Sequence, residues 1–224
     1  MTTLQPPASG RRRRGLVLTI IVSLVAGVGL GIGLVLGALP ALGPSGQTVA
    51  PPVDLHAVDW GDATLPGSVC RSPAPIRLRG GEAVAVPSSF EGPSSNYPQD
   101  VHVDASSVVY GDLTGDGRDE AALPLTCNNH YSTAAGTTVV TALLFDGSSG
   151  EAALLGALSS SQPRLGEIPN AITVSRLLPG RVLGDESFYG PEDATCCPSG
   201  RASTIWPWTG GALGAPQATI TRQR

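Results

Sequence analysis

The sequence contains no lysine, so all 14 of its basic residues are arginine. This absence excludes chemistry that needs a side-chain amine, such as that of Schiff-base enzymes, Walker-type nucleotide hydrolases and acyl transferases of the Ser-x-x-Lys type. A Gly-x-Ser-x-Gly elbow is also missing, and the three histidines, at 56, 102 and 130, lack the spacing of metal ligands. His102 alternates with Asp100 and Asp104, a pattern more typical of a polar strand face than of an acid–base group.

Acidic residues are absent from the first 53 positions, whereas arginines occupy positions 11–14. Beyond residue 40 the chain has 10 arginines and 18 acidic residues, which gives this part a net charge of −8. Phosphate binding draws mainly on clustered positive charge, so nucleic acid is not an expected partner.

The segment Gly15–Leu39 carries no charge, and its only polar side chains are Thr19 and Ser23. At about 1.5 Å of rise per residue, a helix of this length spans the roughly 30 Å hydrocarbon core of a bilayer. A cleaved secretory signal is the alternative, but its apolar region usually covers only about 7 to 15 residues. Because arginines stay on the cytoplasmic side, we predict a cytoplasmic tail (1–14) and an uncleaved membrane helix (15–39) in contact with lipid.

Gly29, Gly33 and Gly37 recur every four residues along one face of this helix. Such spacing lets two membrane helices approach closely and predicts a weak homodimer, with a monomeric glycine-rich anchor as the alternative. Proline and glycine dominate residues 40–53, which are expected to form a stiff tether. The extracytoplasmic domain is expected to cover residues 54–224.

All four cysteines, at 70, 127, 196 and 197, follow the predicted membrane helix. In an oxidising compartment they predict two disulfides, for which three connectivities exist. A bond between Cys196 and Cys197 closes a strained eight-membered ring, so we expect these two to bond Cys70 and Cys127, in either order. The Cys127–His130 spacing is also found in some zinc sites, but one such spacing does not predict zinc.

Apolar and β-branched runs predict a mainly β domain with an antiparallel meander or sandwich, preceded by the membrane helix. Expected strands are 137–145, 171–178, 181–189 and 203–208, with turns at 146–150 and at Pro179-Gly180. Residues 151–158 suit a return strand or a short helix, which leaves α+β as the alternative class. Pro124 and Pro207 lie within strand-like runs, so those runs are expected at a sheet edge or beside a bulge.

The acidic segment Asp112–Glu120, set between two apolar runs, predicts a β-hairpin with positive φ at Gly115 and Gly117. As a calcium loop it would offer oxygens from Asp112, Thr114, Asp116, the Arg118 carbonyl and Glu120, and it resembles the acidic loops of FG-GAP and VCBS repeats. Thr114 replaces the usual acid at position three and Leu123 the glutamate at position twelve, so calcium is expected to bind weakly at most. The alternative is a metal-free turn capped by its aspartates. No other cofactor is expected.

Several features occur in a fixed order across residues 58–210: Trp60, Cys70, Val108–Ala121, Leu125-Thr126-Cys127, Tyr189, Ala194–Ser199 and Trp208–Gly211. This order is similar to that in the actinobacterial LppP/LprE-type lipoprotein family. The resemblance implies an extracytoplasmic location and no particular activity. The chain departs from the family because no cysteine follows the helix closely enough to accept a lipid, which leaves the helix as the anchor.

These features predict a single-pass protein of the cell membrane, with its N-terminus in the cytoplasm and its domain outside. We expect a non-catalytic binding or structural module that contacts an unidentified component of the cell envelope. A calcium-stabilised, adhesion-like domain is one alternative. An envelope hydrolase without a recognisable motif is the other.

Overall fold

The computed structural model describes residues 50–89, 97–131, 136–165 and 168–222. The predicted membrane helix, with Gly29, Gly33 and Gly37, and most of the tether lie outside these residues. In the described part, no helix has the length and hydropathy of a membrane span.

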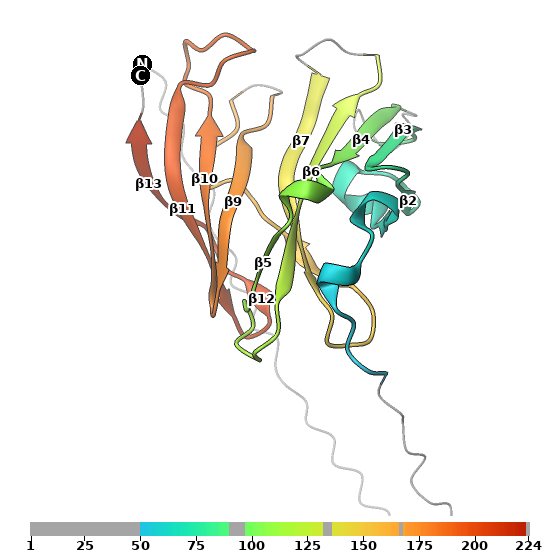
Figure 1. The fold of residues 1–224 in the computed structure, drawn as a ribbon. Helices are drawn as coiled ribbons and strands as arrows, with labels where there is room; N and C mark the ends of the chain where they lie inside the picture. Colours follow the sequence, from blue (N-terminus) through green and yellow to red (C-terminus); the bar gives the residue numbers. More distant parts are fainter. Residues whose placement is uncertain (1–49, 90–96, 132–135, 166–167, 223–224) are drawn as a thin grey trace, which may run out of the picture. The chain divides into compact units, whose positions relative to one another are not determined.

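The described residues form two large antiparallel sheets and a two-stranded ribbon, which confirms the mainly β class (Figure 1). The six-stranded sheet has the order β3 (Glu82–Val86), β4 (Gln99–Val103), β6 (Glu120–Asn129), β7 (Thr137–Asp146), β8 (Ala153–Ala157), with β5 (Val109–Gly111) also paired to β6. The five-stranded sheet has the order β12 (Ala212–Leu213), β11 (Gly200–Thr209), β10 (Arg181–Phe188), β9 (Ala171–Leu178), with β13 (Gln217–Arg222) also paired to β11.

A layer of short elements precedes these sheets. It contains the 3-10 helices η1 (Leu55–Ala57), η2 (Trp60–Asp62) and η3 (Gly67–Cys70) and the ribbon of β1 (Thr64–Leu65) and β2 (Ile76–Arg77). A fourth 3-10 helix, η4 (Ala105–Ser107), links β4 to β5. Asp54, Asp59 and Asp104 each cap the helix that follows by accepting a backbone N–H.

The six-stranded sheet is buried on both faces because its central strands contain the continuous apolar runs 121–125 and 142–145. Ala122 and Leu144 lie in one hydrophobic cluster with Val182 and Trp206 of the five-stranded sheet. The alternate residues, among them Leu123 and Leu143, lie in a second cluster with residues of the short N-terminal elements. In β10, burial alternates along the strand, as expected for a sheet covered on one face. The domain therefore has three layers, with the six-stranded sheet in the middle.

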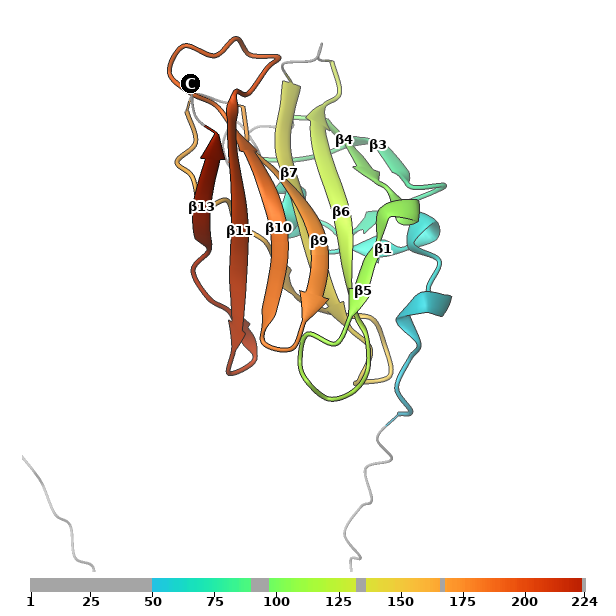
Figure 2. The ribbon, with the colours of Figure 1, turned by 60° about the vertical axis from the view of Figure 1, so that its left-hand side comes forward.

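The expected hairpin around the acidic loop is confirmed, with Gly111 opposite Glu120. The other expected strands are also present, and residues 153–157 form a strand rather than a helix. Figure 2 shows β5 beside β9 of the other sheet, and a Cβ added to Gly111 would lie 2.5 Å from the carbonyl oxygen of Leu177. The acidic loop thus begins where the two sheets touch.

The prediction that these prolines mark a sheet edge or a bulge is wrong. The register shifts of β6 and β11 lie away from them, at Cys127/Asn128 and at Arg201/Ala202. Pro124 lies in the central strand β6, opposite Ala142 of β7. On its other side, β6 pairs with β5 up to Ala122 and with β4 from Leu125 onward. Pro124 therefore falls in the gap between these two partner strands. Pro207 of β11 similarly falls between the segments paired to β12 and β13. A residue without a backbone N–H is tolerated there because no neighbouring strand presents a carbonyl that needs this donor.

Candidate functional site

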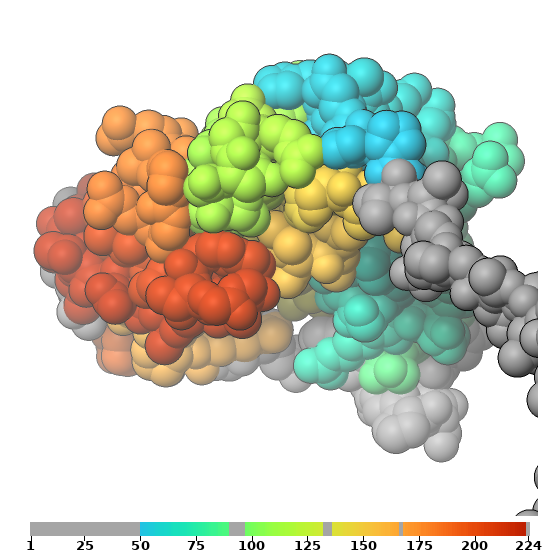
Figure 3. All heavy atoms as spheres, turned by 90° about the horizontal axis from the view of Figure 1, so that it is seen from below, coloured from blue at the N-terminus to red at the C-terminus, as the bar shows by residue number. Residues whose placement is uncertain are grey.

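The acidic loop between β5 and β6 is closed by its own carboxylates. Asp112 accepts backbone N–H groups through Oδ1 from Gly115 (2.7 Å) and Asp116 (3.1 Å), and through Oδ2 from Gly117 (3.1 Å). Gly115 and Gly117 have φ of +81° and +85°, as expected. Seen from below, the loop lies between the first described residues and the C-terminal sheet (Figure 3).

The last predicted calcium ligand, Glu120, is buried at the base of the loop, with 1% of its surface exposed. Its Oε2 accepts the backbone N–H groups of Leu113 (2.6 Å) and Thr114 (2.8 Å), and the Thr114 hydroxyl donates to Oε1. Burial raises the pKa of Glu120 above its usual value, and the hydrogen bonds from Thr114 and Leu113 oppose this shift. Glu120 therefore ties both ends of the loop together.

The remaining predicted ligands lie at the exposed tip. Asp116 accepts the Arg118 backbone N–H and bonds the Arg118 guanidinium at 2.9 Å, contacts that lower the pKa of Asp116. Within the described ranges, no group of three or more His, Cys, Asp or Glu side chains is arranged to hold a metal ion. The weak calcium site therefore stays a prediction.

Asp100 and Asp104, which alternate with His102 in the sequence, form their hydrogen bonds with other residues. Asp100 Oδ1 contacts His130 Nδ1 at 2.7 Å and accepts the Ala85 backbone N–H, while Asp104 accepts hydrogen bonds from Ser106 and Ser107. His102 itself lies 3.7 Å from Glu82 on the exposed face of β4. The pair of Asp100 and His130 was not expected from the sequence, because the two residues meet only when β4 pairs with β6, which His130 follows.

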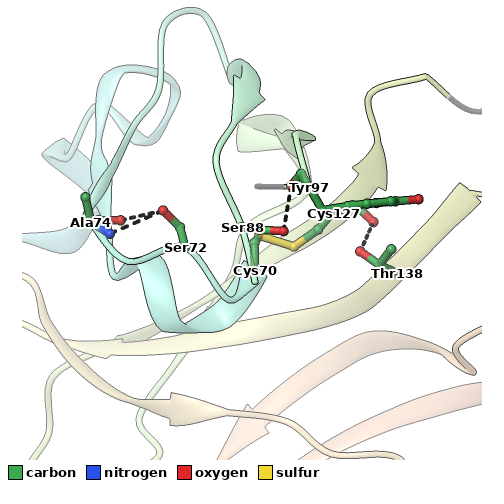
Figure 4. The surroundings of a disulfide bond; sticks show 7 residues. All are labelled: Cys70, Ser72, Ala74, Ser88, Tyr97, Cys127 and Thr138. Carbon is green, nitrogen blue, oxygen red and sulfur yellow. Dashed lines mark hydrogen bonds between the residues drawn. A yellow bond between two sulfur atoms is a disulfide. The ribbon is translucent and has the colours of Figure 1, made fainter. Parts of the chain in front are cut away.

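One disulfide joins Cys70, at the end of η3, to Cys127 of β6. Both residues are buried, with Cα atoms 5.9 Å apart, and Thr138 of β7 donates to the Cys127 carbonyl at 3.0 Å (Figure 4). On the other side of the bond, Ser88 Oγ donates to the Tyr97 carbonyl at 2.8 Å. The disulfide between Cys70 and Cys127 therefore links the N-terminal layer covalently to the six-stranded sheet.

The second disulfide joins Cys196 to Cys197, so the prediction that each bonds a distant partner is wrong. The two adjacent cysteines lie in the loop between β10 and β11, in the other sheet from Cys127. Cys70 and Cys127 lie in one hydrophobic cluster, a proximity that arises only in the folded domain and that local ring strain does not reveal. Once Cys70 and Cys127 are bonded, Cys196 and Cys197 can form a disulfide only with each other.

A cleft of about 320 Å³ opens along the edge of β7, and we call it the β7-edge cleft. Its walls come from Val69, from β7, from the end of β8 and from residues 160–164 and 169–172. Apolar side chains form most of the surface, and Arg164 is its only charged lining residue. The full lining is Val69, Thr138, Val139, Val140, Thr141, Ala157, Leu158, Ser160, Gln162, Arg164, Pro169, Asn170 and Ile172.

The floor of this cleft is an open strand edge. β8 pairs only with Leu143–Asp146, and among the described residues no other strand pairs with 137–141 on the side away from β6. Pro124 has no N–H, so it cannot form a hydrogen-bonded pair with the opposite Ala142. Hydrogen-bonded and non-hydrogen-bonded pairs alternate along an antiparallel ladder. Val140 lies two residues from Ala142, so its N–H and C=O also point away from β6. The bond from Leu158 N–H to the Ala142 carbonyl, at 3.0 Å, agrees with this alternation.

One wall of the cleft is fastened to the five-stranded sheet by a buried carboxylate. Glu186 of β10 is fully buried, and it accepts hydrogen bonds from Ser160 Oγ (2.5 Å), Ser161 N–H (3.0 Å) and Thr204 Oγ1 (2.7 Å). The Trp206 indole donates to the Ser159 carbonyl at 2.7 Å. These contacts hold residues 159–161 in place, so this wall of the cleft is fixed by the fold itself.

No family model, no curated protein and no solved structure matches this chain. The resemblance to LppP/LprE-type lipoproteins therefore stays a prediction. The function must be inferred from the geometry of the domain itself.

Proposed function

We propose that this protein is a non-catalytic binding module of the cell envelope, anchored by its N-terminal helix and placed outside the membrane. In this proposal the β7-edge cleft receives an extended polypeptide segment, which adds to the open edge of β7. The anchor and its orientation rest on the uncharged segment 15–39 and the arginines before it. The buried bond between Cys70 and Cys127 supports an oxidising compartment.

The observation that carries the binding proposal is the open edge of β7 inside an apolar cleft. Extended peptides bind sheet edges through main-chain hydrogen bonds, while pockets beside the edge select their side chains. Val140 offers the main-chain groups, and Val139, Leu158 and Ile172 offer apolar surface next to them. A volume of about 320 Å³ suits a few side chains of a bound segment.

Photo-crosslinking of the full chain in its own membrane tests this proposal. A benzophenone amino acid is placed at exposed Ala157 in the cleft or, as the matched control, at exposed Ser175 on the outer face of the five-stranded sheet. We expect a discrete polypeptide adduct from position 157 and none from position 175. Equal adducts from both positions, adducts with lipid alone, or no adduct at all contradict the proposal.

A second arm uses Val140→Pro with Val140→Thr as its control. Proline removes the N–H that faces the cleft and leaves the β6–β7 ladder intact, because Val140 does not donate to β6. The adduct should disappear in Val140→Pro and persist in Val140→Thr, with both variants melting as cooperatively as the parent. An adduct that survives in Val140→Pro excludes binding by strand addition.

A further inference from the structure

The two disulfides of this protein lie in opposite environments. Cys70 and Cys127 are 1% and 0% exposed, inside the hydrophobic cluster beneath the N-terminal layer. Cys196 and Cys197 are both exposed, in the loop between β10 and β11. Thiol–disulfide exchange begins with a thiolate reaching a sulfur atom, so access differs sharply between the two bonds.

The loop that presents Cys196 and Cys197 is held by contacts that do not involve sulfur. Asp193 Oδ2 accepts the backbone N–H groups of Gly190 (2.7 Å) and Ser199 (2.8 Å), which joins the two ends of the loop. Tyr189 donates its hydroxyl to the Thr195 carbonyl at 3.0 Å, and a turn bond of 2.9 Å links Cys197 N–H to the Ala194 carbonyl. The β10–β11 ladder closes the loop at its base. Opening the sulfur–sulfur bond therefore leaves the two side chains on a preformed loop.

We propose that Cys196 and Cys197 form a redox-operated dithiol site that binds soft, thiophilic cations through both sulfurs. A dithiol reductant opens it by two-electron exchange: one thiolate of the reductant attacks a cysteine sulfur, the bond between Cys196 and Cys197 breaks, and a mixed disulfide forms. The second thiol of the reductant then attacks the mixed disulfide and releases the bound cysteine as a thiol. The products are two cysteine thiols and the oxidised, disulfide form of the reductant. Soft cations prefer thiolate ligands, and adjacent thiolates can bind one ion together, with release of their protons.

This site is independent of the β7-edge cleft, because it lies in a different loop and shares none of the cleft's lining residues. Loss of either function therefore leaves the other testable. Reduction is also expected to leave the fold intact, since the core bond between Cys70 and Cys127 stays closed.

Graded reduction of the full chain in membranes provides the test. Samples are treated with dithiothreitol, alkylated with a maleimide and mapped by mass spectrometry. Half-alkylation of Cys196 and Cys197 is expected at a reductant concentration at least about tenfold below that for Cys70 and Cys127. If both disulfides open together, if the exposed one stays closed, or if mapping links Cys196 or Cys197 to another cysteine, the proposal is overturned.

The binding step is tested with phenylarsine oxide, a probe that bridges two neighbouring thiolates. Added after mild reduction, it should protect both thiols of the parent from the maleimide. In Cys196→Ser and in Cys197→Ser the remaining thiol should be alkylated as if the probe were absent. Alkylation of the parent despite the probe, or equal protection of the single variants, contradicts a two-sulfur site.

Discussion

Gly111, just before the acidic loop, and Gly117, within it, are glycine for different reasons. A Cβ on Gly111 would meet the Leu177 carbonyl oxygen at 2.5 Å, at the contact between the sheets. Gly117 has open space around it but a φ of +85°, where a side chain is strained. The sequence predicted the second reason from turn chemistry. It could not predict the first, because Leu177 is distant in the chain.

Substitution of these two glycines should separate steric overlap from backbone strain. We expect Gly111→Ala to lower the free energy of unfolding by about 1–3 kcal/mol by forcing the sheets apart. Gly117→Ala should lower it by about 1–2 kcal/mol, without loss of packing. Urea unfolding followed by tryptophan fluorescence measures both, since all three tryptophans lie beyond residue 53. A Gly111→Ala variant as stable as the parent contradicts the described contact between β5 and β9.

The buried carboxylate of Glu186 is the second residue whose role the sequence did not reveal. Glu186→Ala leaves the donors of Ser160, Ser161 and Thr204 without their acceptor, so the free energy of unfolding should fall by about 2–4 kcal/mol. Glu151→Ala, at an exposed position, is the matched control and should change it by less than about 0.5 kcal/mol. Equal stabilities for the two variants exclude a structural role for Glu186.

Among the elements, the two disulfides should contribute unequally to stability. The bond between Cys70 and Cys127 spans 57 residues, and restricting a loop of this length in the unfolded chain is worth about 4 kcal/mol. The bond between adjacent cysteines restricts almost nothing, so its expected contribution is about 1 kcal/mol. The Cys70→Ser, Cys127→Ser double variant should therefore unfold at much lower urea than the Cys196→Ser, Cys197→Ser double variant. The reverse order contradicts this assignment.

The loop between β10 and β11 should loosen in acid. Hydrogen bonds from the backbone N–H groups of Gly190 and Ser199 lower the pKa of Asp193, so its folded form binds a proton less readily than the unfolded chain does. The resulting stabilisation is present above the ordinary aspartate pKa and is lost as the pH falls through the lowered value. The difference in urea midpoint between the parent and Asp193→Asn should shrink between about pH 5 and pH 2. A difference that stays constant over this range refutes the role of the charge.

Prediction from sequence succeeded for elements whose signals are local. The apolar run 137–145 and the turn at Pro179-Gly180 matched β7 and the β9–β10 connection. It failed for Pro124, because the gap between β4 and β5 exists only once both strands are paired to β6. The strand β13 was also missed, although the β-branched run Thr219-Ile220-Thr221 could have indicated it.

At the scale of the whole molecule, the sequence predicted an antiparallel β domain but not the layers of this one. The middle sheet is buried on both faces because short elements between residues 55 and 78 cover one of them. Those elements lack the periodicity that identifies strands and helices. The β7-edge cleft was missed for a related reason, since its lining comes from four separate stretches of the chain.

The central claim is that a disulfide-bonded β domain is held outside the membrane by one helix. Proteinase K applied to intact cells, with an epitope tag at the N-terminus, tests this claim directly. We expect cleavage within residues 40–53, release of the folded domain with Cys70 still linked to Cys127, and protection of the tag until the cells are lysed. A domain released only after lysis, or released with Cys70 as a free thiol, contradicts the claim.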